Sequence, residues 1–161
     1  MTRRTRSREI ALQVLYQAEQ NTGLPATEIR KFVERRLLAD KKLVGFADAL
    51  ISGVQTHKVR IDQLISDVAE NWRLDRMAAI DRNILRLGAF ELLYCPDVPA
   101  KVAINEALEL AKRYSTAQSS RFVNGILDRL RAAAESSELP AAEKPQAPSE
   151  TAVEENPPAT S

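Results

Sequence analysis

Apolar side chains recur at helical spacing along most of the chain, from residue 7 to residue 134, and no convincing alternating strand pattern interrupts them. Breaks that contain glycine or proline separate the stripes, notably NTGLP at 21–25 and CPDVP at 95–99. Two of the stripes, one ending near Val54 and the next starting near Ile61, predict separate helices. The pattern as a whole predicts an all-α fold of about seven helices joined by short loops.

Several polar residues mark where these helices should begin. Asp40 and Asp75 each precede an apolar stripe, and each is predicted to cap the helix that follows. Ser115 is followed three residues later by Gln118, which is the spacing of a capping box for the last helix. The break at 71–76 is the predicted seam between two helical subdomains.

The end of the chain differs sharply in composition from the rest. Residues 135–161 hold six acidic residues and one basic residue, together with five of the eight prolines. Such a segment has too few large apolar side chains to offset its ordering entropy. We therefore predict a helical domain over residues 1–134, followed by a disordered acidic tail at 135–161. Without the tail the chain carries 22 bases and 16 acids, which is compatible with an anionic partner.

The sequence offers no apparatus for catalysis. The single cysteine, Cys95, excludes an internal disulfide and fits a reducing compartment. The single histidine, His57, has no cysteine or carboxylate cluster beside it, and neither a P-loop nor a GxGxxG pattern occurs. We therefore expect a protein that is not an enzyme and that needs no metal and no cofactor. Because no apolar run reaches the ~18 residues of a membrane span, and no secretory signal is visible, we expect a cytoplasmic protein with no membrane contact.

The N-terminus concentrates positive charge. Arg3, Arg4, Arg6 and Arg8 all precede the first acidic residue, Glu9. Positive side chains oppose the dipole at the start of a helix, so local stability does not explain them. Phosphate groups would, because arginine offers a planar fork of donors to oxyanions. A solvated basic arm is the alternative, and this stretch alone leaves the two open.

The stretch SSRFVNGILDRL, residues 119–130, has helical spacing but contains Asn124-Gly125, a pair more typical of tight turns. Gly125 has no side chain, and our preferred interpretation is that a second helix approaches closely there. Phe122 borders the apolar stripe, so it can take a place in the core.

Two longer segments, VPAKVAINEALELAKRYS (98–115) and FVNGILD (122–128), closely resemble the signature of the NusB family of bacterial transcription antitermination factors. ALQVLYQ near the start resembles the family's first helix, and IDRNILRLGAFELLY its central one. The resemblance spans roughly residues 3–132, with the motifs in order. The acidic tail is not part of the family pattern, and Gln118 is neutral where an acid is expected.

The resemblance implies an all-α protein of two packed helical subdomains that binds single-stranded boxA RNA together with NusE, a small-subunit ribosomal protein. Such a protein nucleates an antitermination complex on ribosomal RNA operons and reaches the transcribing RNA polymerase through other Nus factors. The implied RNA-binding residues are Arg3, Arg4, Arg6, Arg8, Lys101, Phe122 and Asn124. Phe122 would offer a stacking face to an unpaired base, with a place in the core as an equal alternative, and Asn124 would offer donors and acceptors. An RNA backbone is the alternative close neighbour of Gly125. The implied NusE-binding residues are Tyr16, Asp81, Arg82 and Arg86. The alternative is a helical scaffold that holds NusE or RNA polymerase without recognising RNA.

Overall fold

The structure is a computed structural model that describes residues 3–70 and 72–136. Within these ranges it contains α-helices and one 3₁₀ turn, and no strand. The elements are α1 (Arg3–Gln20), α2 (Ala26–Arg36), α3 (Lys41–Val68), η1 (Leu74–Arg76), α4 (Ala79–Tyr94), α5 (Ala100–Tyr114) and α6 (Ala117–Glu135). The all-α prediction is confirmed. Residues 137–161, which hold nearly all of the predicted acidic tail, lie outside the described residues.

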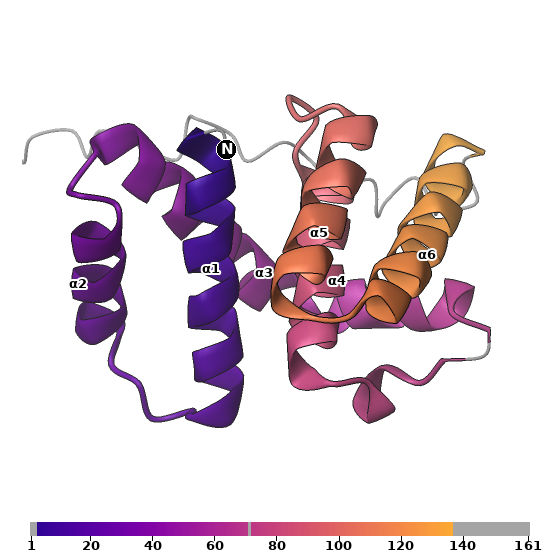
Figure 1. Ribbon diagram of the computed structural model, residues 1–161, viewed down its shortest axis with the longest axis horizontal. Coiled ribbons are helices and arrows are strands. Elements are labelled where there is room, and N and C mark those ends of the chain that lie inside the picture. Colours follow the sequence, from indigo (N-terminus) through magenta and orange to yellow (C-terminus); the bar gives the residue numbers. More distant parts are fainter. Residues whose placement is uncertain (1–2, 71, 137–161) are drawn as a thin grey trace, which may run out of the picture.

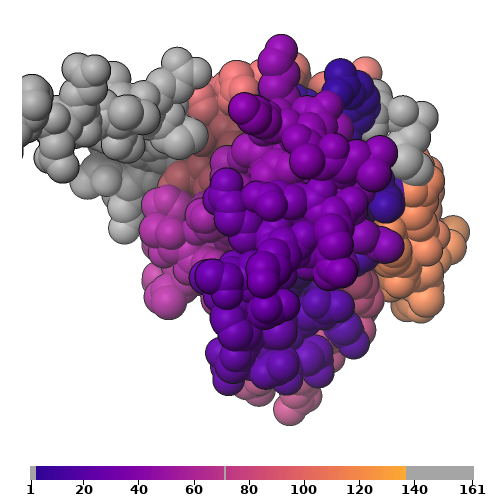
Figure 2. Space-filling model, turned by 90° about the vertical axis from the view of Figure 1, so that its left-hand side faces the viewer, coloured from indigo at the N-terminus to yellow at the C-terminus, as the bar shows by residue number. Residues whose placement is uncertain are grey.

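One long helix, α3, connects the two sides of the molecule (Figure 1). On one side α1 and α2 pack together and against α3, and on the other α4, α5 and α6 pack against one another. Viewed from the left-hand side, α2 and the first part of α3 form much of the surface (Figure 2). The core between the helices is largely aliphatic, and its largest fully buried apolar side chains are Ile10, Leu12, Val14, Leu50, Ile61, Ile65, Ile84, Leu85, Leu87, Leu127 and Leu130.

The prediction of separate helices around Val54 and Ile61 is wrong, because α3 is continuous over 28 residues. The polar run between the two stripes contains neither glycine nor proline, so nothing in it ends a helix. Gly53 has a different role, since a Cβ atom there would overlap the ring of Phe90. Absence of a side chain at this position therefore lets the α4 phenyl ring pack directly against α3.

Helix starts follow the predicted caps only in part. The Asp40 prediction is confirmed, because its Oδ1 accepts hydrogen bonds from the amides of Lys42 and Leu43 at 3.1 and 3.2 Å. The Asp75 prediction is wrong, since Asp75 belongs to η1 and α4 starts only at Ala79. Between them the backbone is extended at Met77, a buried residue, so the helix begins after it.

The last helix starts one residue later than predicted. Thr116 is its N-cap, and Thr116 Oγ1 accepts a hydrogen bond from the amide of Ser119 at 3.0 Å. Further along α6, a Cβ atom on Gly125 would meet nothing within 4 Å. The interpretation of Gly125 as a helix-crossing point is therefore wrong. The crossing is at Gly88 of α4, where a Cβ atom would lie 2.9 Å from Leu127 of α6 and 3.1 Å from Ala107 of α5. The division into subdomains at 71–76 stays a prediction.

Candidate nucleic-acid interface

Three helices, α1, α3 and α5, begin at the same end of the molecule, at the top of Figure 1. Side-chain contacts join the first two turns of these helices. Ser7 Oγ donates to the carbonyl oxygen of Leu43 at 3.0 Å, which ties α1 to α3. Thr5 Oγ1 donates to the carboxylate of Glu106 at 3.0 Å, which ties α1 to α5. Cations in these first turns are thereby gathered at one end of the fold, which we call the cationic end.

The cationic end holds four of the predicted RNA-binding residues. Arg3 has a side chain 75% exposed and pairs with Asp40, the cap of α3. Arg4 is exposed, and its guanidinium lies 4.7 Å from the centroid of the Phe46 ring, a cation–π contact. Arg6 is half-buried, with Nη1 3.1 Å from Glu9. Lys101 is exposed in the first turn of α5.

Arg8 differs from its neighbours because it is buried. Its side chain is 3% exposed, with Nε 2.8 Å from Glu91 Oε1 and Nη2 2.7 Å from Glu91 Oε2. Its Nη1 lies 3.7 Å from Glu106. Burial alone would lower the pKa of Arg8, but the hydrogen bonds and charge of Glu91 raise it above its usual value. Arg8 thus holds α1 against α4 and α5 and presents no exposed face to a phosphate.

Phe122 and Asn124 do not share a surface. Phe122 is half-buried and stacks on Trp72, with 5.1 Å between ring centroids and 21° between ring planes. Asn124 is exposed, and two residues along a helix place it roughly 200° around the axis from Phe122. Phe122 borders a cavity of about 440 Å³ that is distinct from the cationic end; its lining residues are Trp72, Arg73, Arg76, Met77, Ala78, Asp81 and Phe122.

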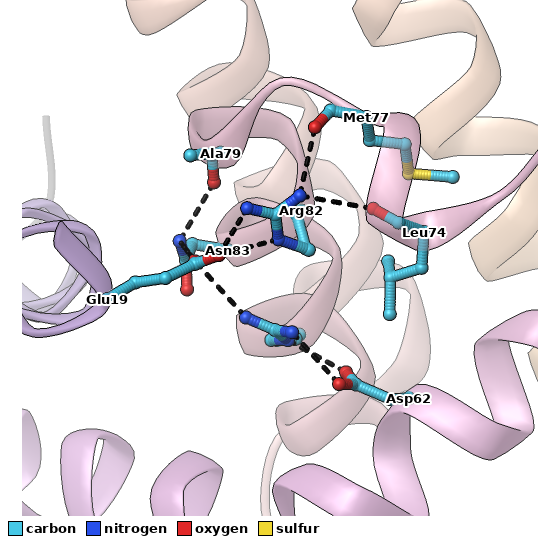
Figure 3. Close-up of polar contacts among 8 residues, drawn as sticks. Glu19, Asp62, Leu74, Met77, Ala79, Arg82 and Asn83 are labelled. Carbon is cyan, nitrogen blue, oxygen red and sulfur yellow. Dashed lines mark hydrogen bonds and ion pairs between the residues drawn. The ribbon is translucent and has the colours of Figure 1, made fainter.

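A network of charged side chains joins α1, α3 and α4 (Figure 3). Arg82 is its centre: Nε lies 2.8 Å from Glu19 Oε1, and Nη1 donates to the carbonyl oxygens of Leu74 and Met77 at 3.2 and 2.9 Å. Arg86 binds Asp62 through Nε at 2.7 Å and Nη2 at 2.9 Å. This network fastens the end of α1 to α4 and fixes the chain leading into α4.

Glu19 is the shared acceptor of this network. It also accepts from Nδ2 of Asn83 at 2.7 Å, and Nη1 of Arg86 lies 3.3 Å away. Burial acts to raise the pKa of the Glu19 carboxyl, but Arg82, Asn83 and Arg86 together lower it below its usual value. The carboxylate form of Glu19 is therefore stabilised by the fold.

Among the four predicted NusE-binding residues, Tyr16 alone is exposed, at 39%. Asp81 and Arg86 are buried, and the Arg82 side chain is 14% exposed inside the network. Beside the network lies an open cavity of about 920 Å³, lined by Glu19, Asp62, Ser66, Ala69, Glu70, Trp72, Arg73, Leu74, Asp75, Arg82 and Arg86. The structure thus places Tyr16 on the surface and the other three residues within the fold.

Sequence reasoning missed several charged residues around these sites. Lys41 and Lys42 are exposed in the first turn of α3, directly after the Asp40 that binds Arg3. Their signal was available, since two cations at a helix start are as unfavourable there as in α1. Glu19 and Glu91 were missed because their arginine partners lie 63 and 83 residues away in the sequence.

The remaining reactive side chains are occupied in packing. The His57 ring stacks on Tyr94 with 4.2 Å between centroids. Burial raises the pKa of the Cys95 thiol to about 12, and the charges of Glu91 and Asp97 add to the shift. Within the described residues, no group of three or more His, Cys, Asp or Glu side chains is arranged to hold a metal ion. No helix in the same ranges is long and apolar enough to cross a membrane.

Comparisons with known proteins all find members of the NusB family. The model of the NusB family matches residues 5–132. The transcription antitermination protein NusB of Myxococcus xanthus is 51% identical over 133 residues, which cover 81% of this chain and 95% of the relative. NusB of Anaeromyxobacter dehalogenans is 46% identical over 129 residues, covering 80% of this chain and 90% of the relative.

Solved structures are similar over the same region. NusB of T. maritima has a TM-score of 0.73 and 40% identity, covering 86% of this chain and 99% of that one. A second match is the crystal structure of the antitermination factors NusB and NusE in complex with dsRNA. It has a TM-score of 0.73 and 27% identity, and covers 83% of this chain and 98% of that one.

Proposed function

We propose that this chain, which belongs to the NusB family, is a transcription antitermination factor. It binds boxA-type single-stranded RNA together with NusE and nucleates an antitermination complex on ribosomal RNA operons. The observation that supports binding of RNA and NusE is the similar solved structure of NusB and NusE in complex with dsRNA. The single-stranded boxA element is what the family resemblance implies. Through NusE and other Nus factors the complex reaches the transcribing RNA polymerase.

The cationic end is the proposed phosphate-binding surface. Arg4 and Lys101 are exposed there, and no ion pair reaches either of them from the described part of the chain. Arg3 and Arg6 lie beside them, each with one carboxylate contact. Electrostatic contacts to phosphates supply much of the affinity of such proteins and make it depend on salt. Arg8 contributes indirectly, by holding α1 in place through Glu91.

NusE is proposed to contact the side of α1 that carries Tyr16. A partly exposed tyrosine offers apolar area and a hydroxyl group at low entropic cost, as interface residues often do. Arg82 and Arg86 stabilise this surface indirectly, because their contacts with Glu19 fix the end of α1. Asn124, exposed on the outer side of α6, is assigned to RNA.

The protein is proposed to act by binding alone, in the cytoplasm where transcription takes place. Support comes from the surroundings of its single cysteine and its single histidine. Cys95 keeps its thiol proton at neutral pH because its pKa is about 12. His57 has one ring face against Tyr94.

The test is a fluorescence anisotropy titration of boxA-type RNA and a scrambled control, with and without NusE, at several salt concentrations. We expect preference for boxA, strengthened by NusE. Arg4→Ala/Lys101→Ala should reduce the salt slope by about 1.4, because each phosphate contact on a single strand contributes about 0.7. Lys58→Ala/Lys112→Ala is the matched control, since both lysines are exposed and lie outside the first turns of α3 and α5.

Three outcomes would contradict the proposal or one of its parts. Equal binding of boxA and scrambled RNA would leave only a nonspecific basic surface. Binding of NusE without any binding of RNA would favour the helical scaffold. An unchanged salt slope in Arg4→Ala/Lys101→Ala would show that RNA contacts the protein elsewhere.

A further inference from the structure

We propose that the cavity between η1, α4 and α6 is a pocket for one unstacked guanine base, with Asp81 as the residue that selects it. The cavity has a volume of about 440 Å³, within the usual range for small-molecule sites. This inference rests on the proposed RNA binding and adds a base preference to it. We call the site the base pocket; its working parts are Asp81, Trp72, Phe122, Arg73 and Arg76.

The carboxylate of Asp81 has unused hydrogen-bonding capacity. Asp81 is 6% exposed, and its Oδ2 accepts a hydrogen bond from Ser119 Oγ at 3.0 Å. Its Oδ1 is buried and receives no hydrogen bond from any described residue. Buried polar atoms nearly always have a partner, and an unsatisfied one calls for an explanation such as a bound molecule. A ligand that donates N–H groups to this carboxylate would supply the missing bonds.

Asp81 is held in a fixed position by the start of α6. Ser119, its donor, also donates its backbone amide to Thr116 Oγ1 at 3.0 Å. The Ser119 hydroxyl in turn lies 3.0 Å from Ser115 Oγ, which donates to it. This chain of bonds orients the Ser119 hydroxyl toward Asp81. The carboxylate is therefore set before any ligand arrives.

Two stacked aromatic rings form one wall of the base pocket. The half-buried Phe122 ring stacks on Trp72, and Trp72 is 45% exposed. Exposure thus falls from Trp72 to the buried Asp81, as expected for a pocket with an open rim and a closed floor. Exposed aromatic rings provide stacking platforms for unpaired bases in RNA-binding proteins. A base that stacks on this wall can direct one edge toward Asp81.

The rim carries positive charge. Arg73 and Arg76 both line the cavity and are exposed. Arg73 pairs with Asp75, with 3.3 Å between Nη2 and Oδ2, while no ion pair to Arg76 occurs among the described residues. Arginine side chains on the rim beside a stacked base suit the phosphate of the same nucleotide or its neighbour. Charge, stacking and a buried acceptor together fit a nucleotide better than an apolar ligand.

The carboxylate decides which base is preferred. The Watson–Crick edge of guanine presents two adjacent N–H donors, from N1 and N2, and a carboxylate can accept both. The edges of adenine, cytosine and uracil place an acceptor atom beside the donor, and a carboxylate repels that acceptor. The orphaned Oδ1, with the remaining lone pair of Oδ2, therefore matches guanine.

The test replaces each guanine of a boxA-type RNA in turn by inosine, which keeps N1–H but lacks the amino group on C2. For the parent protein, one position should weaken binding about tenfold, and the other positions should change it little. In Asp81→Asn, RNA with guanine at that position should bind about tenfold more weakly, and inosine there should cause no further loss. The carboxamide oxygen in this variant can still accept from Ser119, so we expect the variant to fold, and its melting curve checks this.

Two further measurements separate the base pocket from general effects. Asp128→Asn makes the same change of charge on exposed α6 surface and should keep the parent preference for guanine. Trp72 is the single tryptophan, so its fluorescence reports directly on the pocket wall. Addition of the RNA should quench this fluorescence, and the inosine RNA at the selected position should quench it less at equal concentration.

The outcomes distinguish this inference from the function on which it rests. Retained RNA binding with no inosine-sensitive position overturns the base pocket and leaves the antitermination role intact. The same conclusion follows if Asp81→Asn keeps the full preference for guanine. Failure of every RNA to bind, with or without NusE, overturns both proposals.

Discussion

The burial of Arg8 leads to a prediction that separates a role in folding from a role in RNA binding. Arg8→Ala removes three hydrogen bonds and leaves the carboxylate of Glu91, which is 2% exposed, without its main partner. Loss of one member of a buried ion pair typically destabilises a protein by about 3–5 kcal/mol. For roughly 130 folded residues, an unfolding entropy of about 2.1 cal/mol/K per residue converts this to a fall in Tm of about 11–18 °C.

The assay is thermal unfolding followed by circular dichroism, together with RNA titration well below the lower Tm. Arg4→Ala is the matched control, because it removes the same kind of side chain from an exposed position and loses only a cation–π contact, at most about 1 kcal/mol. We expect Arg4→Ala to melt within about 4 °C of the parent and to bind RNA more weakly. Arg8→Met/Glu91→Leu should recover most of the stability, since apolar residues replace both charges.

Two results would refute this reasoning or part of it. If Arg8→Ala melts within about 4 °C of the parent and weakens RNA binding as much as Arg4→Ala does, Arg8 faces the RNA and the buried pair contributes little. A large loss of stability in the Arg8→Met/Glu91→Leu variant would instead show that the charges themselves are required.

Other parts of the fold give sharper tests of packing and titration. Gly53→Ala should lower the free energy of unfolding by about 1–3 kcal/mol in urea titrations, because its Cβ atom would clash with the Phe90 ring. Gly125→Ala has no neighbour to clash with and should raise the free energy of unfolding by up to about 1 kcal/mol. Equal effects of the two substitutions would contradict both predictions. The pKa of Glu19 is lower in the folded protein than in the unfolded chain, so near pH 4 the unfolded chain binds more protons. The ion pairs of Glu19 therefore stabilise the fold fully above its unfolded-state pKa, and this stabilisation is lost as the pH falls through its folded-state pKa. In Glu19→Gln the free energy of unfolding should accordingly fall less steeply below about pH 5. An unchanged pH dependence in this variant would contradict the stabilising role of Glu19. At pH 8 Cys95 of the folded protein should react with iodoacetamide on the order of a thousandfold more slowly than glutathione does, because its raised pKa leaves little thiolate. Rapid labelling that does not depend on unfolding would show that the thiol pKa is lower than about 12.

Local features of the fold were predictable from the sequence because local rules produce them. Helical periodicity depends on residues three and four apart, and the cap at Asp40 depends on amides two and three residues away. The start of α4 was not predictable in this way. It depends on Met77, which adopts an extended backbone and is buried in tertiary packing.

The candidate site was likewise predictable only in part from the sequence. Four arginines near the start of the chain indicated an anionic partner, but the sequence did not reveal that Arg8 turns inward. A signal existed, because Arg8 lies three and seven residues before Ala11 and Leu15 on the apolar stripe of α1. Glu91 likewise lies within the apolar run of α4. Only the three-dimensional structure shows that these two residues meet across 83 positions of sequence.

The unbroken course of α3 has a mechanical consequence. A helix of 28 residues is about 42 Å long, and because its central glycine, Gly53, is packed against the Phe90 ring, it behaves as a stiff rod. One end is fastened beside α1 through Asp40 and Arg3, and the other to α6, where Arg129 Nη1 donates to the carbonyl of Val68 at 3.0 Å. The helices fastened to the two ends of α3 are therefore held at a set spacing, and a partner that contacts both must match that spacing.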